Sequence, residues 1–262
     1  MVGKAADIDL DWSGDESAIR IRAFERSELD QLLNIFSEAV PGAQLRRSIY
    51  VAPGAEAFLA RLLEHPSLHT RQQLWGVELK DKGFVAAAHT RFIEENHHLN
   101  NYAVLPALQR RGLGGRMMAH WESLARLQRS KRLTLDVDLE NERARRHYAR
   151  FGFSDQARSY EYKFEGSRDF PAPKDVHLID WAVAQACFQI HGFGRFALAL
   201  GGEHHSVDFR VGEFRLGSRD ARLLSALQAI DPSRRILVRT PEVVKDPLWA
   251  HTGTIVHMIK EL

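Results

Sequence analysis

The sequence predicts an α/β (α+β) fold, with a mixed central sheet flanked by helices and a smaller C-terminal α/β domain. Three observations support this prediction. Segments that alternate apolar and polar residues, typical of half-buried strands, are interleaved with segments of helical apolar spacing. The 262 residues exceed the length of an average domain. A stretch with Pro171 and Pro173 separates two such blocks and indicates a linker, because proline favours extended backbone.

Residues 18–166 form the larger predicted domain, after a polar and flexible arm at 1–17. Its first strand, at 19–24, alternates apolar and charged residues. Gly152 ends its last helix, as glycine often does. The other expected elements are helices at 29–36 and 58–63, strands at 74–79, 84–92 and 99–104, a helix around 117–125, a strand at 133–137, a helix at 141–151 and a strand at 159–164.

Residues 174–262 form the smaller predicted domain. Its expected elements are a helix at 176–190, strands at 196–200 and 205–216, a helix at 221–230 and strands near 236–238 and 253–260. This mixture of helices and strands again favours an α/β layout around one sheet.

Composition limits the class of protein. Lys plus Arg is 36 and Asp plus Glu is 34, so the net charge of +2 gives no reason to expect nucleic acid or a membrane as partner. The single Cys187 cannot form an internal disulfide, and its apolar neighbours favour a core position. The sequence contains no apolar run of about 20 residues and no secretory signal, so we expect a cytoplasmic protein.

The passage from Gln109 to Gly115 follows a predicted strand and opens the next helix. Amides at a helix start carry partial positive charge and favour an anion such as phosphate. Gly112 and Gly114 let the backbone approach that anion closely. Three arginines add charge nearby: Arg110, Arg111 and Arg116. Such turns also occur without a ligand, so this passage alone leaves both interpretations open.

A second passage, at 141–153, lies downstream, and together the two resemble the GNAT superfamily of acetyl-CoA-dependent N-acetyltransferases. The positions that match its cofactor motif are Val104, Pro106, Gln109, Gly112 and Gly114. Those that match its following helix motif are Asn141, Ala144, Tyr148, Gly152 and Phe153. The resemblance covers roughly residues 18–165 and implies a GNAT-type sheet.

The resemblance implies acetyl-CoA as cosubstrate. Backbone amides would bind its pyrophosphate, namely those of Gln109, Arg110, Arg111, Gly112, Leu113, Gly114 and Gly115. The strand with Val104 would separate from the strand with Leu135, and the pantetheine arm would fill the gap. The Tyr102 amide would donate to the thioester oxygen, where a preorganised donor contributes strongly.

The helix at 141–151 would contribute side chains to the same site. By the family pattern, Asn141 contacts the cofactor arm and Tyr148 protonates the departing thiolate; the alternative for Tyr148 is a core tyrosine. Asn141 and Tyr148 lie two helical turns apart and share a face. Arg145 lies between them and is a candidate for the adenosine phosphates, although an arginine run is more often a solvated helix face.

The match to the family is weakest at the position of the general base. The family often places a carboxylate or histidine six or four residues before Val104, and here those positions hold His98 and Asn100. Asn100 cannot act as a base. If strand alternation is preserved, His98 shares a face with Tyr102 and lies about 13 Å from it, so a water relay is needed. A surface histidine is the alternative.

These observations predict an N-acetyltransferase that moves an acetyl group from acetyl-CoA to a primary amine of a small molecule or peptide. The alternative is a non-catalytic acyl-CoA-binding or sensing protein. Adjacent histidines on a strand point to opposite faces, so we expect no metal site. The loop at 40–54, with Arg46, Arg47 and Tyr50, is expected to border the acceptor. Its two arginines suggest an acceptor with a carboxylate or phosphate; the alternative is an ordinary basic surface loop.

We interpret the C-terminal domain as a degenerate GNAT-like half that shapes the acceptor pocket. This interpretation rests on its closing strands, which are similar to those that end the family's domains. The alternative is an unrelated α/β appendage used for dimerisation, which leaves a homodimer open.

Overall fold

The structure is a computed structural model that describes residues 19–40, 42–45, 48–64, 71–80, 82–166 and 173–262. The predicted arm at 1–17, Arg46 and Arg47, and most of the predicted linker lie outside these residues. We call residues 19–166 the N-terminal half and residues 173–262 the C-terminal half.

The N-terminal half contains six strands and five helices among its described residues. The strands are β1 (Ile19–Ala23), β2 (Gln72–Leu79), β3 (Gly83–Ile93), β4 (Asn96–Val104), β5 (Arg132–Asp138) and β6 (Ser154–Phe164). The helices are α1 (Leu29–Ala39), α2 (Gly42–Leu45), α3 (Ala55–Glu64), α4 (Leu113–Leu127) and α5 (Glu142–Arg150), with single 3-10 turns at Arg26–Glu28, Ile49–Val51 and Pro106–Leu108.

The C-terminal half contains the remaining strands and two helices. The strands are β7 (Val176–Ile179), β8 (Phe193–Leu200), β9 (Glu203–Arg210), β10 (Glu213–Leu216), β11 (Arg235–Thr240) and β12 (Trp249–Glu261), and the helices are α6 (Trp181–His191) and α7 (Ala221–Ile230). The predicted helix at 176–190 is wrong in its first turn, because Val176–Ile179 pairs with β8 and Asp180 at φ 59° ends that strand. The predicted strand at 205–216 is a hairpin of β9 and β10.

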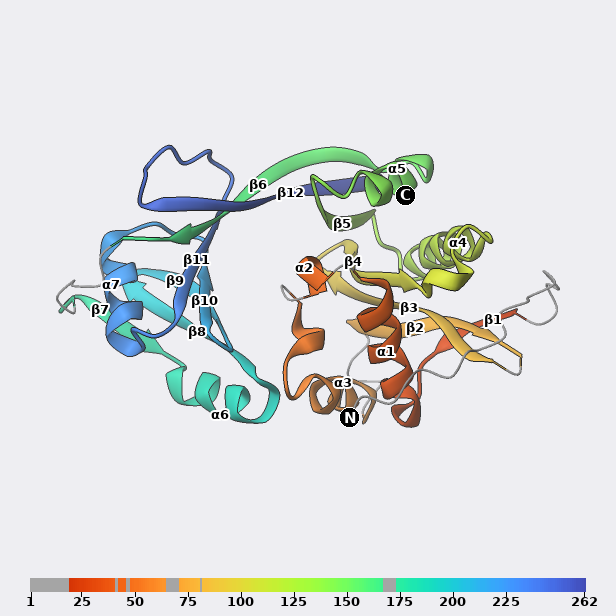
Figure 1. The fold of residues 1–262 in the computed structure, drawn as a ribbon, viewed down its shortest axis with the longest axis horizontal. Helices are drawn as coiled ribbons and strands as arrows, with labels where there is room; N and C mark the ends of the chain where they lie inside the picture. The colour runs from red at the N-terminus through yellow and green to blue at the C-terminus, as the bar shows by residue number, and fades with distance from the viewer. Residues whose placement is uncertain (1–18, 41, 46–47, 65–70, 81, 167–172) are drawn as a thin grey trace.

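All twelve strands form one sheet in the order β1-β2-β3-β4-β5-β12-β6-β11-β10-β9-β8-β7. The mixed α/β fold with flanking helices is therefore confirmed. β12, from the end of the chain, lies between β5 and β6 and is antiparallel to both. β6 in turn pairs with β11. Figure 1 shows the two lobes that result, joined by the long β6 and β12.

The two halves exchange strands in a symmetric way. Reading outward through the N-terminal half, parallel strands β4 and β5 are followed by β12 and β6. Reading through the C-terminal half, parallel strands β10 and β11 are followed by β6 and β12. Each half thus completes its sheet with a strand of the other, as two related halves would. The boundaries drawn from the sequence at 166 and 174 mark a change along the chain, while the sheet itself continues across them.

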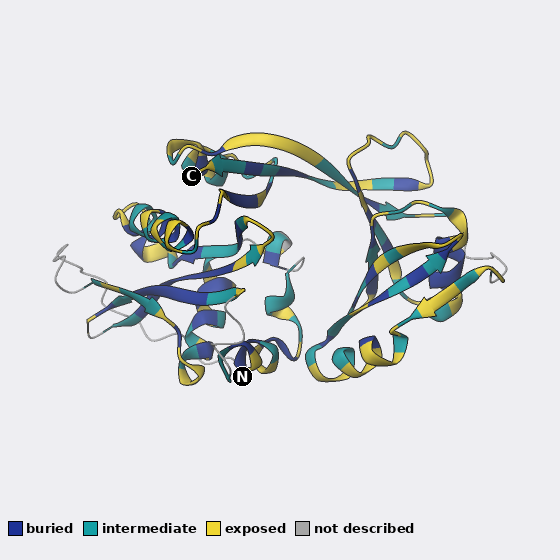
Figure 2. Cartoon of the chain, turned by 180° about the vertical axis from the view of Figure 1, so that it is seen from behind, coloured by how far each residue is buried: buried dark blue, intermediate teal, exposed yellow. Residues whose placement is uncertain are grey.

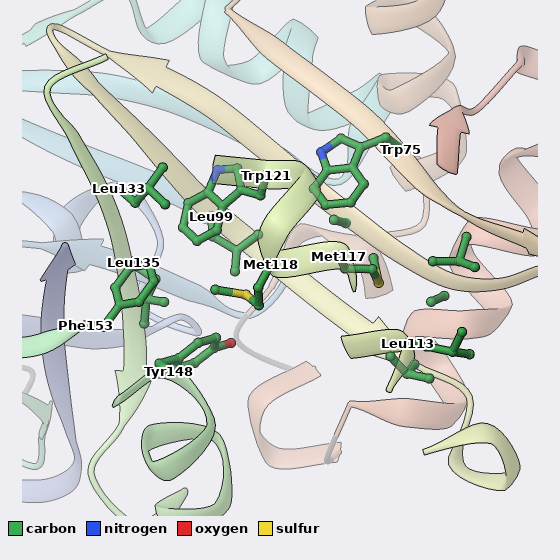
Figure 3. Close-up of a cluster of buried hydrophobic side chains, with 14 of the residues drawn as sticks. Trp75, Leu99, Leu113, Met117, Met118, Trp121, Leu133, Leu135, Tyr148 and Phe153 are labelled. Atoms are coloured by element: carbon green, nitrogen blue, oxygen red, sulfur yellow. The ribbon is translucent and has the colours of Figure 1, made fainter. Parts of the chain in front are cut away.

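Hydrophobic clusters lie on both faces of the N-terminal sheet, and a third lies in the C-terminal half. One cluster packs α4 and α5 against β4, β5 and β12, and includes Trp121, Leu135 and Tyr148. Figure 3 shows it in close-up, with Tyr148 beside Met118. A second cluster packs α1 and α3 on the opposite face. Figure 2 shows these strands buried between the helices. The sheet is thereby covered on both faces where β4 and β5 meet.

Candidate active site

Strands β4 and β5 separate in the middle of the sheet. Their parallel pairing extends from Asn96 and Arg132 to Leu99 and Leu135, the last pair between them among the described residues. β4 then continues to Val104 and β5 to Asp138, and both segments line one cavity. The opening between two strands exposes backbone groups that a further strand would otherwise pair. This matches the gap that the family resemblance implies.

A β-bulge marks the start of the opening. On β3, His89 pairs with Asn101 and Thr90 with Leu99, so Asn100 is an extra residue in β4. A bulge reverses the alternation of side chains beyond it. Leu99 and Tyr102 therefore pack in the same cluster, although they are three positions apart, an odd spacing that regular alternation would place on opposite faces.

The bulge overturns the expectation that His98 and Tyr102 share a face. His98 is buried beside β5, where its Nδ1 lies 2.9 Å from Thr134 Oγ1, and it is not among the residues that line the cavity. Burial lowers the pKa of His98 to about 4. A neutral, weakly basic imidazole that is turned away from Tyr102 is a poor general base.

Helix α4 begins at the rim of this opening. Its N-cap is Gly112 at φ 82°, and Arg110 has φ 62°. Left-handed residues in such a turn direct successive amides toward one point. The first backbone bond of the helix runs from the Arg116 amide to the Gly112 carbonyl oxygen at 3.2 Å, so the preceding amides have no partner within the helix. Among the described residues, no side chain caps this end.

Glycine at position 114 permits the close approach of a side chain. A Cβ there would lie 2.5 Å from the Tyr102 phenol oxygen, which is too short for any real contact. Gly114 thus lets the Tyr102 ring lie directly on the first turn of α4. Space remains open around Gly112, where a Cβ would meet no described atom within 4 Å. An open, uncapped helix start fits a bound diphosphate.

Gln109 fastens the loop to the end of β4. Its Nε2 donates to the Val104 carbonyl oxygen at 2.9 Å, and its Oε1 accepts from an Arg143 guanidinium nitrogen at 2.7 Å. Arg143, on α5, lines the cavity with Arg146 and Arg150. Arg145, the arginine expected at the cofactor, instead forms an ion pair with Asp155 at 2.7 Å and is not among the lining residues. Arg143, Arg146 and Arg150 therefore supply the positive charge at this end of the cavity.

Two tyrosines and a histidine meet behind the opening. The rings of Tyr102 and Tyr148 lie 6.5 Å apart, and the Tyr102 phenol lies 3.3 Å from His147 Nε2. Burial raises the pKa of Tyr148 above its ordinary value. Burial, then Arg150 and Arg143, lowers the pKa of His147, which keeps its imidazole neutral. Tyr148 is 9% exposed and lines the cavity, so it is a protonated phenol within reach of a ligand.

Asparagine side chains hold the local backbone. Asn141 caps α5, since its Oδ1 accepts from the Ala144 amide at 3.1 Å, and it also lines the cavity. The Tyr102 amide donates to Asn101 Oδ1 at 2.9 Å. The Asn101 carboxamide therefore occupies the position where a thioester oxygen is expected, and it must turn aside for that amide to serve a ligand.

The cavity has a volume of about 1410 Å³ and extends from α4 to the C-terminal half. Sites for one small molecule are typically 300–1,000 Å³, so this volume is large enough for two substrates. Of the residues predicted from sequence, those that line it are Tyr102, Val104, Gln109, Arg110, Gly112, Gly114, Gly115, Asn141 and Tyr148. Arg111 and Leu113 do not; the Leu113 side chain belongs to the core.

Sequence reasoning missed the groups that β12 and β11 contribute. His257 on β12 pairs with Asp136 on β5, with its Nδ1 3.0 Å from Asp136 Oδ1. Arg239 on β11 donates to the other carboxylate oxygen at 2.9 Å. Burial alone would raise the pKa of Asp136, but Arg239 and His257 lower it below its ordinary value. Asp136 and His257 are 121 residues apart in the chain, so no local pattern could reveal the contact.

Comparisons with known proteins agree with this geometry. Residues 30–153 match the model of the acetyltransferase (GNAT) family. None of the curated proteins compared with the chain matches it. Solved structures match almost its whole length. A protein of Pyrococcus horikoshii is 18% identical, with 94% of this chain and 90% of that chain covered and a TM-score of 0.63. A tandem GNAT protein of the clavulanic acid biosynthesis pathway is 14% identical, with 93% and 98% covered and a TM-score of 0.61, and a GCN5-related N-acetyltransferase of Sphaerobacter thermophilus is 12% identical, with 93% and 96% covered and a TM-score of 0.60.

These structures share the fold of both halves. The match to the family model lies within the N-terminal half. The chain carries a domain of the GNAT acetyltransferase family. Within the described part of the chain, no helix is long and apolar enough to cross a membrane, and no three metal-binding side chains gather.

Proposed function

We propose that this protein is an N-acetyltransferase that moves an acetyl group from acetyl-CoA to a primary amine of a small molecule or peptide. The observation that carries the proposal is the opening between β4 and β5, with the uncapped start of α4 at one end and the Tyr148 phenol beside it. The first would bind the diphosphate and the second would face the sulfur. A cytoplasmic location and the absence of a nucleic-acid or membrane partner remain predictions.

The transfer involves three reacting groups: the attacking amine, the thioester oxygen and the departing sulfur. The neutral amine nitrogen attacks the thioester carbon, the Tyr102 amide donates to the oxygen that gains negative charge, and the carbon–sulfur bond then breaks. The thiolate takes the Tyr148 phenol proton. The proton that the amine loses passes to a base and then to solvent, while Tyr148 is reprotonated.

His257 is better placed than His98 to act as the general base. With Nδ1–H donating to Asp136, the other ring nitrogen, Nε2, is left to accept a proton. His257 lines the cavity, whereas His98 does not. The charged groups nearest to His257 are Asp136 on β5, Arg239 on β11, which bonds to the same carboxylate, and, more distantly, His98 on β4. We therefore assign His257 as the base that relays the amine proton.

The test measures thiol release from acetyl-CoA over a broad panel of amines. We expect Tyr148→Phe to lower kcat by about 100-fold or more while the KM for acetyl-CoA changes little, as for loss of a general acid. Phe153→Leu, a change in the same core cluster away from the cavity lining, is the matched control. If acetyl-CoA raises the Tm yet no amine yields thiol release sensitive to Tyr148→Phe, the sensing alternative replaces this proposal.

The pH profile of kcat/KM separates the two histidines. If His98 were the base, the acid limb would bend near pH 4, because that is its pKa. We expect instead that His257→Asn lowers kcat/KM at every pH, while His98→Asn leaves the profile unchanged. An undiminished kcat/KM in His257→Asn contradicts the assignment.

A further inference from the structure

The side chains of Tyr102 and His147 lie together against the open start of α4. The Tyr102 phenol oxygen is 3.3 Å from His147 Nε2, and the two rings are stacked with their centroids 5.9 Å apart. A Cβ at Gly114 would lie 2.5 Å from the phenol oxygen and 3.4 Å from His147 Cε1. All three residues line the cavity. The pair is therefore at the end of the cavity where we expect the diphosphate of acetyl-CoA.

The hydrogen bond between the two side chains can be made in two directions. A neutral imidazole has one N–H and one acceptor nitrogen, and a phenol has a single O–H. If His147 Nε2 accepts, the Tyr102 O–H is used within the pair. If Nε2 carries a proton, it donates to the phenol oxygen, and the Tyr102 O–H is free to donate to a ligand. An imidazolium has N–H groups on both nitrogens, so protonation of His147 fixes this second direction.

Nearby charge decides which form His147 adopts. The charged and titratable groups that face it are Arg143, Arg150 and Tyr148 on its own helix and Tyr102 on β4. On the loop before α4, Arg110 also lines the cavity, while the first three residues of α4 carry no titratable side chain. Burial, then Arg150 and Arg143, lowers the pKa of His147. A diphosphate at the start of α4 would oppose the arginine charges and favour the imidazolium.

We propose that Tyr102 and His147 form a further part of the diphosphate site, where His147 takes up a proton as the cofactor binds and Tyr102 donates its O–H to a phosphate oxygen. The inference rests on the proposed function, which assigns the diphosphate to the start of α4. The proton comes from solvent and adds to the neutral ring, and no bond of the cofactor is broken. Binding that takes up a proton becomes stronger as the pH falls, so the affinity should rise toward acid.

Calorimetric titration of dephospho-coenzyme A into the full-length protein tests the proposal without turnover. This probe keeps the diphosphate, which is a diester that does not titrate near neutral pH, and lacks the phosphate monoester, which does. Titration at pH 7 in two buffers with different enthalpies of ionisation gives the number of protons taken up per molecule bound. We expect net proton uptake, and an affinity at least about threefold higher at pH 6 than at pH 8.

Three variants locate the proton uptake. His147→Gln keeps a side chain that can hydrogen-bond to the phenol but cannot titrate, so it should abolish the uptake and flatten the pH dependence. Tyr102→Phe removes the donor and should weaken binding at pH 6 about fivefold, as expected for one lost hydrogen bond. His120→Gln changes a half-buried histidine on α4 that packs on Trp75 and does not line the cavity, and it should behave as the unaltered protein.

The outcomes separate this inference from the proposed function. Binding without proton uptake, or uptake that persists in His147→Gln, overturns the inference and leaves the acetyl transfer standing. Binding of coenzyme A but not of dephospho-coenzyme A also overturns it, because the affinity then depends on the phosphate monoester and not on the diphosphate. If neither compound gives saturable heat, the start of α4 binds no diphosphate, and both proposals fail.

Discussion

Helices α4 and α7 occupy corresponding places in the two halves but begin in different ways. α4 starts at Gly112, with an open turn of left-handed residues and no side-chain cap among the described residues. α7 starts at Asp220, whose carboxylate accepts from the Arg222 amide at 2.8 Å. A carboxylate at a helix start takes the place and the charge of a bound phosphate. The start of α7 is thus occupied by a side chain of its own, whereas the start of α4 is open.

The strands before these two helices also differ, in how far each stays paired with the next parallel strand. β10 and β11 stay paired over the whole of β10, from Glu213 to Leu216, whereas β4 leaves β5 after Leu99. A closed sheet leaves no gap for a cofactor arm. The comparison shows how one layout can open between two strands in one half and stay closed in the other.

Separating the two halves is expected to have the largest effect on folding. A fragment of residues 1–166 loses β12, which leaves β5 and β6 without the strand between them and removes His257. Exposed strand edges favour aggregation. We expect the fragment to be aggregated or unfolded in size-exclusion chromatography and circular dichroism, where the full chain is folded. A fragment that unfolds cooperatively as a monomer would show that the N-terminal half is complete without its exchanged strand.

Gly112→Asp gives α4 the cap that α7 has. A fixed carboxylate beside the diphosphate should weaken coenzyme A binding by about 100-fold through like-charge repulsion. Gly112→Asn is the matched control, since asparagine has the same shape, also tolerates positive φ and carries no charge. Calorimetric titration of coenzyme A measures both. Equal affinities of the two variants would mean that the helix start does not face the phosphates.

Acid should destabilise the N-terminal half through its buried histidines. Burial lowers the pKa of His89 to about 3, and that of His97 and His98 to about 4. An unfolded histidine has a pKa near 6.5, so the unfolded state binds more protons between these values and stability falls as pH drops from 6.5 toward 4. Each histidine contributes up to about 1.4 kcal/mol per pH unit.

Denaturant unfolding at several pH values measures this slope. His97→Met, which replaces a buried ring whose nitrogens have no partner among the described residues, should reduce the slope. His204→Asn, at an exposed position of β9, should not change it. If His97→Met keeps the full slope, the acid sensitivity has another origin.

The smallest expected effects come from removing the side chains that cap α5 and α7. Asn141→Ala and Asp220→Ala each remove a side chain that accepts from a backbone amide, and each should cost about 1 kcal/mol of stability. Only Asn141→Ala should also weaken coenzyme A binding, because Asn141 lines the cavity and Asp220 does not. Equal coenzyme A affinity in both variants would limit Asn141 to capping.

Local patterns predicted the elements and the loop before α4, because strand alternation, helical spacing and glycine position are properties of neighbouring residues. They could not predict that β12 inserts beside β5, since that pairing joins residues more than a hundred positions apart. The bulge at Asn100 is also invisible in the sequence, and it reversed the face assigned to His98. Arg145 was chosen by helical position alone, without knowledge of Asp155 on the next strand.

The position of β12 also constrains the order in which the molecule is made. During synthesis, the loop at Gln109–Gly115 and Tyr148 leave the ribosome long before Trp249–Glu261. Until that last strand emerges, β5 remains an open edge and Asp136 lacks His257. We therefore expect a nascent chain that already has the loop before α4 and Tyr148 to remain inactive until the C-terminal half has been translated.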